Sequence, residues 1–81
     1  MARLVWLGRL ADLAGRGDQE LALPAPLDWP GLLARLPETL AEELRGDRVR
    51  VARNGALLTE KALLVIAPDD EIAFLPPVSG G

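Results

Sequence analysis

The end of the chain, EIAFLPPVSGG at residues 71–81, decides the fold and raises the question of function. Glu71–Leu75 is a short apolar run that predicts a β-strand. Pro76 and Pro77 forbid its continuation, because proline has no N–H to donate to a neighbouring strand. The sequence therefore predicts a strand that passes into a stiff spacer, and two glycines follow at the tip.

The N-terminal third of the chain supplies the first partners for this strand. Arg3–Leu7 predicts a strand, and Gln19–Leu23 predicts a second one that ends at prolines. Between them, Leu10–Ala14 predicts a short helix that glycine stops. The first and last strands are the most apolar, so we expect them at the centre of the sheet.

Two helical segments are expected in the middle of the chain. Asp28 is a good N-cap, Pro30 suits the first helical turn, and Pro37 should divide the helix in two. Gly46 should end the second piece. Leucines at helical spacing predict the face that packs on the core. They are Leu32, Leu33, Leu36, Leu40 and Leu44.

The last third alternates between short strands and turns. Val49–Arg53 predicts a strand, and Asn54-Gly55 is the strongest turn signal of the chain. Leu57-Leu58 should return as a short strand, whereas Leu63–Ile66 is either a buried loop or a short strand. Together these elements predict an α+β fold, in which a mixed sheet is packed by a helix on one face.

Composition limits the function. The chain has 81 residues, 49% of them hydrophobic and 26% charged, which predicts one globular domain. It has no Cys and no His, which excludes disulfides, thiolate or imidazole metal sites and Cys- or His-based catalysis. A net charge of −3 argues against a nucleic-acid partner. No apolar run predicts a membrane span or a signal peptide, so we expect a cytoplasmic protein without a membrane partner.

Two charged clusters have plain structural interpretations. Arg48, Arg50 and Arg53 alternate with valines, which predicts the solvated face of a strand rather than a phosphate-binding patch. The acidic run at residues 69–71 predicts a solvated turn rather than a cation site, so no metal is expected.

The tail itself carries the chemistry. Pro76 and Pro77 favour an extended exit from the sheet, and Val78 is a plausible apolar anchor. Gly80 and Gly81 lack side chains and can pass through a narrow channel. The terminal carboxylate is an anion at neutral pH and a poor electrophile, so a partner must activate it. The chain has no phosphate-binding loop with which to do so itself.

Three stretches resemble the small subunit of molybdopterin synthase, a sulfur-carrier family with the ubiquitin-like β-grasp fold. They are RLVWLGRLADLAG at residues 3–15, RNGALL at 53–58 and PDDEIAFLPPVSGG at 68–81. The similarity spans nearly the whole chain, and the last stretch is the most specific. The middle matches only in length and helical pattern. The family usually has Gly at position 69 and often Phe where Leu7 and Leu75 stand.

The resemblance implies a division into a β-grasp domain, residues 1–75, and an extended Gly-Gly tail, residues 76–81. It implies that an adenylyltransferase similar to the ubiquitin-activating enzyme uses ATP and Mg to adenylate Gly81. A persulfide sulfur would then replace AMP and leave a thiocarboxylate. The tail, Pro76, Pro77, Val78, Ser79 and Gly80, would carry that sulfur into the large synthase subunit, which supplies the active-site chemistry. The carrier itself would be non-catalytic and bind no cofactor.

The resemblance also implies a docking surface. Leu7, Leu57 and Leu75 match positions where the family presents apolar side chains to its partners. Other functions stay open. Tails of this kind are shared with sulfur carriers for thiamine or tRNA thiolation and with ubiquitin-like protein modifiers, and a simple interaction domain could carry an inert tail. The single lysine, Lys61, makes chain building by a modifier awkward.

Overall fold

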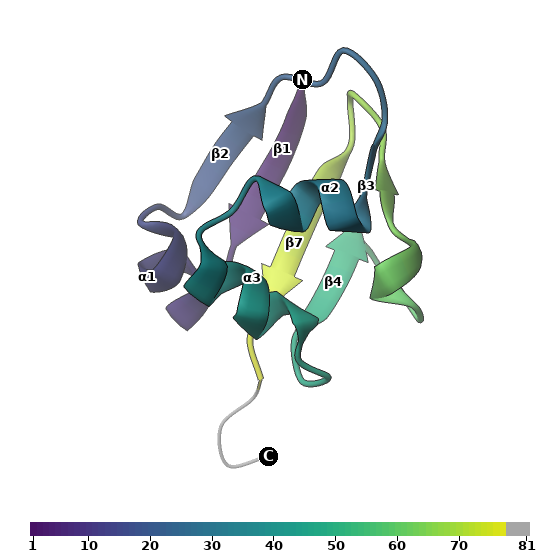
Figure 1. Ribbon diagram of the computed structural model, residues 1–81. Helices are drawn as coiled ribbons and strands as arrows, with labels where there is room; N and C mark the ends of the chain where they lie inside the picture. The colour runs from purple at the N-terminus through teal and green to yellow at the C-terminus, as the bar shows by residue number, and fades with distance from the viewer. Residues whose placement is uncertain (78–81) are drawn as a thin grey trace.

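The computed structural model describes residues 1–77. A twisted sheet lies against helices on one of its faces (Figure 1). The elements are β1 (Ala2–Trp6), α1 (Arg9–Ala14), β2 (Asp18–Leu21), β3 (Leu27–Asp28), α2 (Trp29–Ala34), α3 (Glu38–Arg45), β4 (Arg50–Arg53), β5 (Ala56–Leu57), the 3₁₀ turn η1 (Lys61–Leu63), β6 (Val65–Ile66) and β7 (Glu71–Leu75). The α+β expectation is confirmed.

The main sheet has the strand order β2-β1-β7-β4-β5. β1 and β7 are parallel, and every other neighbouring pair of this sheet is antiparallel, so the sheet is mixed as expected. The first and last strands of the chain thus lie side by side, and β7 is central. Each of these two strands is hydrogen-bonded on both edges, which suits their apolar sequences.

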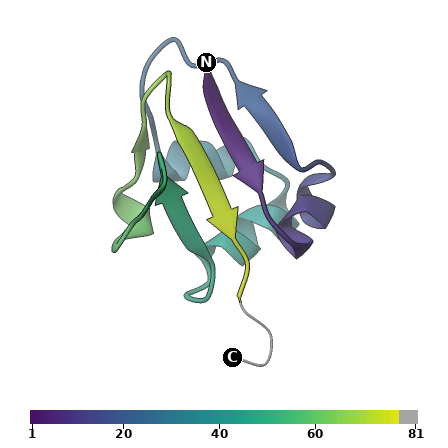
Figure 2. The ribbon, with the colours of Figure 1, turned by 180° about the vertical axis from the view of Figure 1, so that it is seen from behind.

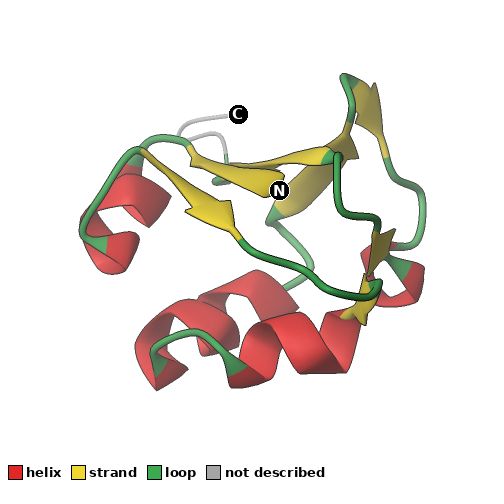
Figure 3. Ribbon diagram, turned by 90° about the horizontal axis from the view of Figure 1, so that it is seen from above, coloured by secondary structure: helices red, strands yellow, loops and turns green. Residues whose placement is uncertain are grey.

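The inner face of the sheet forms the core with α2 and α3. Alternate residues of β1 and β7, among them Leu4, Trp6, Ile72 and Phe74, are almost fully buried. The rings of Trp6 and Phe74 stack with centroids 4.3 Å apart. Figure 3 shows both helices beneath this one face, and Figure 2 shows the opposite face of the sheet without a helix over it. That open face carries the alternate side chains of the same strands.

The helix boundaries follow the expected signals. The carboxylate of Asp28 accepts a hydrogen bond from the Gly31 N–H at 2.9 Å, so it caps α2 as predicted. Pro37 separates α2 from α3, and Gly46 follows the end of α3. The predicted leucine stripe packs inward, with Leu36 only partly buried.

Several details differ from the sequence prediction, and β1, β4 and β5 are each displaced or shortened by one residue. A second sheet of two strands, β3 and β6, was not foreseen. The run Leu63–Ile66 is shared between the end of η1 and β6, so its second half is a short strand. β2 covers Asp18–Leu21 instead of Gln19–Leu23, because its ladder with β1 pairs Leu21 with Ala2, the first residue of β1.

The interpretation of the acidic turn was wrong for Asp70. Its side chain is buried, and it accepts hydrogen bonds from Arg53 Nε, Asn54 Nδ2 and the Ala67 N–H, each 2.9 Å long. Asp69 and Glu71 are exposed, as expected. Among residues 1–77, no helix has the length and apolar composition needed to cross a membrane.

Candidate functional site

The site is built around the end of β7, which leads into the tail. β7 ends at Leu75, and Pro76 and Pro77 follow as half-buried residues; we call these three residues the tail root. The strand is held on both edges up to this point: the Leu7 N–H donates to the Phe74 carbonyl at 3.1 Å, and Leu75 pairs with Arg50 of β4. The direction in which the chain leaves the domain is therefore fixed by the sheet.

A hollow of about 540 Å³ opens beside the tail root; we call it the tail-root groove. Leu75, Pro76 and Pro77 form one part of its lining. The rest comes from the α3–β4 loop and from β4 and β5, through Asp47, Arg48, Arg50 and Leu57. The groove is thus an apolar floor bordered by two guanidinium groups and one carboxylate.

The three leucines expected to dock a partner do not all share this groove. Leu57 and Leu75 line it together, and Leu57 is 57% exposed. Leu7 is 40% exposed and lies outside the lining. It follows β1, whose parallel register with β7 pairs Trp6 with Phe74 and so places position 7 beside position 75. The docking role of these leucines stays a prediction.

The distal part of the predicted tail, Val78, Ser79, Gly80 and Gly81, lies outside the described residues. The division of the chain at residue 75 likewise stays a prediction. What the structure adds is the position of the root: Pro76 and Pro77 start from the middle strand of the sheet, on the side where β4 and β5 form the groove.

Gly8 was missed by the sequence analysis. It has a φ of 55°, in the left-handed region that favours glycine, and a Cβ at this position would lie only 2.8 Å from Pro76 Cγ. Glycine therefore allows the turn after β1 and the close approach of the tail root. A glycine placed directly after a predicted strand was the available signal.

The sequence analysis placed the groove arginines on the face of a strand, but only Arg50 lies in β4, whereas Arg48 lies in the loop before it. Arg50 is exposed and Val51 is buried, as the alternation predicted. Within residues 1–77, neither Arg48 nor Arg50 has a carboxylate within ion-pair distance, whereas Arg53 pairs with Asp70. Their place beside Leu75 depends on the pairing of β4 with β7, which a single sequence does not specify.

The groove is suited to binding rather than to bond making. In the described part of the chain, acidic side chains nowhere gather into a group that could hold a metal ion. The groove offers guanidinium groups, which stay protonated, and apolar side chains. Such a surface can contact apolar and acidic side chains of a partner.

Comparison with known families decides the relationship. A family model described as "ThiS family" matches residues 6–81. The chain belongs to the ThiS family. A search of curated proteins found no match.

Solved structures that resemble this ThiS-family chain cover nearly all of it. SAMP1 from Haloferax volcanii is 26% identical, with a TM-score of 0.69 over 99% of this chain and 98% of that one. The small archaeal modifier protein 1 from Methanosarcina acetivorans is 21% identical, with a TM-score of 0.68 over 99% and 95%. A Pyrococcus furiosus protein described as molybdopterin converting factor, subunit 1, is 21% identical, with a TM-score of 0.67 over 95% and 97%. The ubiquitin-like β-grasp fold is thereby confirmed.

Proposed function

We propose that this ThiS-family chain is the sulfur carrier of a molybdopterin synthase, the small subunit that delivers sulfur on its C-terminus. The observation that carries the proposal is the ending FLPPVSGG, residues 74–81, attached to the central strand of a domain whose groove has no catalytic group. A terminal carboxylate on a thin glycine tip is the group such a domain can present.

The proposed chemistry proceeds in two stages. A partner adenylyltransferase uses ATP and Mg to form an acyl-adenylate at Gly81. A persulfide of a sulfur donor then displaces AMP to form an acyl disulfide, and a donor thiol cleaves its S–S bond, which leaves the thiocarboxylate on Gly81 and a disulfide on the donor. The sulfur remains covalently bound until the large synthase subunit transfers it to the pterin precursor. The carrier returns as a carboxylate and supplies no catalytic side chain.

The groove gives this proposal a physical basis for partner binding. Leu57 and Leu75 offer apolar surface beside the root, and Arg48 and Arg50 offer charge that acidic partner side chains can complement. Because Leu75 directly precedes Pro76, a partner bound at the groove receives the tail in a fixed direction. The large subunit and the adenylyltransferase would use this surface in turn.

The test is the mass of the intact chain after incubation with ATP, Mg²⁺, the adenylyltransferase and a persulfide donor. We expect an increase equal to the difference between one sulfur and one oxygen atom, and its loss when the large subunit and the pterin precursor are added. A control variant with one residue added after Gly81 should fold but gain no mass. A mass increase in the extended variant would contradict the proposal.

A second candidate function is protein modification. SAMP1 from Haloferax volcanii, whose name stands for small archaeal modifier protein 1, is 26% identical to this chain over nearly its whole length. Both functions share the activation of Gly81 and differ in the acceptor, which is sulfur in one and a lysine amine in the other. Stable attachment to other proteins after activation, without transfer of sulfur to a pterin, would favour the modifier.

A further inference from the structure

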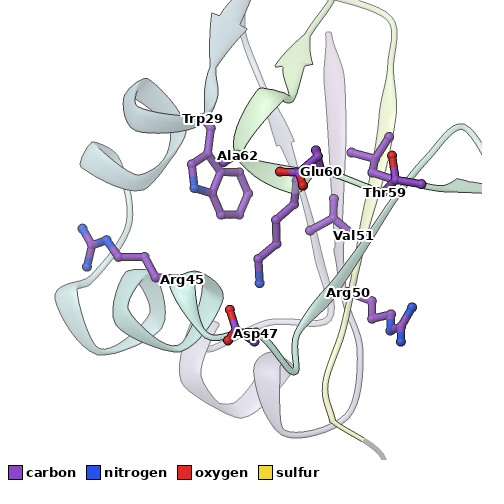
Figure 4. A pocket seen from close by; sticks show the side chains of 10 residues that line it. Trp29, Arg45, Asp47, Arg50, Val51, Thr59, Glu60 and Ala62 are labelled. Carbon is purple, nitrogen blue, oxygen red and sulfur yellow. The ribbon is translucent and has the colours of Figure 1, made fainter.

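Lys61 is the only lysine of the chain, and its amine is hydrogen-bonded to backbone carbonyl groups. Nζ donates to the Gly46 carbonyl, just after α3, and to the Val49 carbonyl at 2.8 Å. The side chain is half-buried and lines a pocket of about 440 Å³. Figure 4 shows Trp29 and Arg45 on one side of this pocket and Val51 on the other. Lys61 thus joins η1 to the loop between α3 and β4.

Acyl transfer to a lysine has requirements that this geometry opposes. The amine must be neutral, and its lone pair must reach the acyl carbon; an N–C bond forms, the bond to the leaving group breaks and one proton passes to solvent. The Lys61 amine is instead held toward two carbonyl oxygens. Burial lowers the pKa of Lys61, which favours the neutral amine, but a neutral Nζ whose two N–H groups stay bonded to these carbonyls can present its lone pair in one direction only.

We propose that Lys61 is a shielded amine, so that the folded chain offers no accessible lysine to an activated C-terminus, its own or that of a second copy. The other basic residues are all arginines, which stay protonated and are poor acyl acceptors. The shielding matters because Gly46 and Val49 flank Asp47 and Arg48, which line the tail-root groove. An extended tail of six residues spans about 20 Å, enough to bring an activated terminus to this loop.

The remaining amine is the α-amino group of Met1. It lies 3.6 Å from the Asp69 carboxylate. Because β1 and β7 are parallel, Met1 is at the end of the sheet opposite to the tail root. If the chain is attached to another protein, the product therefore carries one copy and is not extended through a lysine. This consequence rests on the proposed activation of Gly81, whereas the shielding does not.

The test of shielding uses the folded chain alone and an acetylating probe, the N-hydroxysuccinimide ester of acetic acid. The variant Arg16→Lys adds an amine in the exposed α1–β2 connection, so both amines are compared in one molecule. Peptide mass spectrometry over time should show Lys61 acetylated at least about tenfold more slowly than the introduced amine, because two hydrogen bonds hold the half-buried Lys61 amine in one orientation, and reorienting it costs at least one of them. In denaturant the two rates should become equal.

Equal rates in the folded chain would overturn the proposal, and so would faster acetylation of Lys61, which would indicate a reactive lysine with a lowered pKa. Neither result would bear on the sulfur-carrier role, because no activating enzyme is present.

In a second experiment the parent chain and Arg16→Lys are each incubated with the adenylyltransferase, ATP and Mg²⁺. We expect covalent dimers with Arg16→Lys and none with the parent chain. Dimers of the parent chain joined through Lys61 would overturn the shielding, whereas absence of the acyl-adenylate in both would contradict the proposed function instead.

Discussion

Asp70 is the residue that fastens the turn before β7 to the β4–β5 hairpin. Its pKa is held below the ordinary value, chiefly by the Asn54 amide and then by the Ala67 N–H, while burial acts in the opposite direction. Because the folded-state pKa is the lower one, this carboxylate stabilises the fold above the unfolded pKa of about 4, and the contribution is lost as pH falls through the folded pKa. We expect Asp70→Asn to lower the free energy of unfolding by about 1–3 kcal/mol at pH 7.

Urea denaturation between pH 7 and pH 2.5 would measure this difference. The gap between the parent chain and Asp70→Asn should narrow below about pH 4, since the parent then loses the same charge. Asp69→Asn is the matched control, because the Asp69 carboxylate is fully exposed and solvent screens its ion pair with the Met1 amine. A pH-independent gap would show that the hydrogen-bond geometry, not the charge, matters.

Gly8 and Gly15 form a natural pair for testing the position of the tail root. Both have φ in the left-handed region, 55° and 79°, but only Gly8 has a close neighbour, Pro76. Either change to Ala costs about 1–2 kcal/mol of backbone strain. Gly8→Ala must also displace the rigid Pro76 ring, so we expect it to slow thiocarboxylate formation at Gly81 severalfold, whereas Gly15→Ala should leave the rate unchanged. Equal rates of thiocarboxylate formation for both variants would show that the close approach of Gly8 to Pro76 does not affect this reaction.

At the scale of elements, the strongest local signals predicted the structure well. β7 has the bounds that its apolar run and the following prolines indicated. The Asn54-Gly55 turn has φ values of 50° and 87°, as expected for a two-residue hairpin loop. β3 could not be foreseen, because it has two residues, follows two prolines and exists only through its pairing with β6.

Element pairing also explains why the groove could not be predicted in full. Leu75 was expected at the tail root from the sequence, but the arginines reach it only because β4 pairs with β7. Likewise, Asp70 looked like one of three solvated acids, because its partners Arg53 and Asn54 are distant in sequence. Local patterns predict elements, whereas long-range pairing decides which side chains share a site.

The end of β7 gives a prediction about docking. Leu75→Glu places a charge in the groove on the open face of the sheet, where Leu75 is only half-buried. We expect loss of binding to the large synthase subunit by at least about tenfold, because an apolar contact is replaced by a desolvated carboxylate. The melting temperature should change by only a few degrees, as it does for most surface changes.

The matched control is Leu63→Glu in η1. Leu63 is 76% exposed and does not line the groove, so this variant should bind normally. Isothermal titration of both variants with the large subunit, alongside thermal melting, separates docking from folding. Unfolding of Leu75→Glu would place Leu75 in the core and contradict its docking role.

At the scale of the whole molecule, the parallel pairing of β1 with β7 places the first and last strands of the chain side by side. It places Gly8 beside Pro76 and stacks Trp6 on Phe74 beneath the tail root. The apolar character of these two strands predicted their central place, and the resemblance predicted the fold. The orientation of each strand needed the structure. The sheet can therefore hold the start of the tail in a fixed position.

This arrangement predicts that the residues up to Pro77 contribute to stability, whereas residues 78–81 are needed for function but not for stability. Removal of residues 78–81 should change the free energy of unfolding by less than about 0.5 kcal/mol, since terminal residues outside the core contribute little. Removal of residues 76–81 should cost about 1 kcal/mol more, because it exposes apolar surface where Pro76 and Pro77 lie half-buried. Both variants should lose thiocarboxylation completely.

Urea denaturation, followed by the fluorescence of the buried Trp6 and Trp29, measures the free energy of unfolding of each variant. The intact mass of the chain measures its thiocarboxylation. A large loss of stability on removing residues 78–81 would make the tip part of the fold, and a carrier whose tip is part of its fold could not insert it into a partner without partly unfolding.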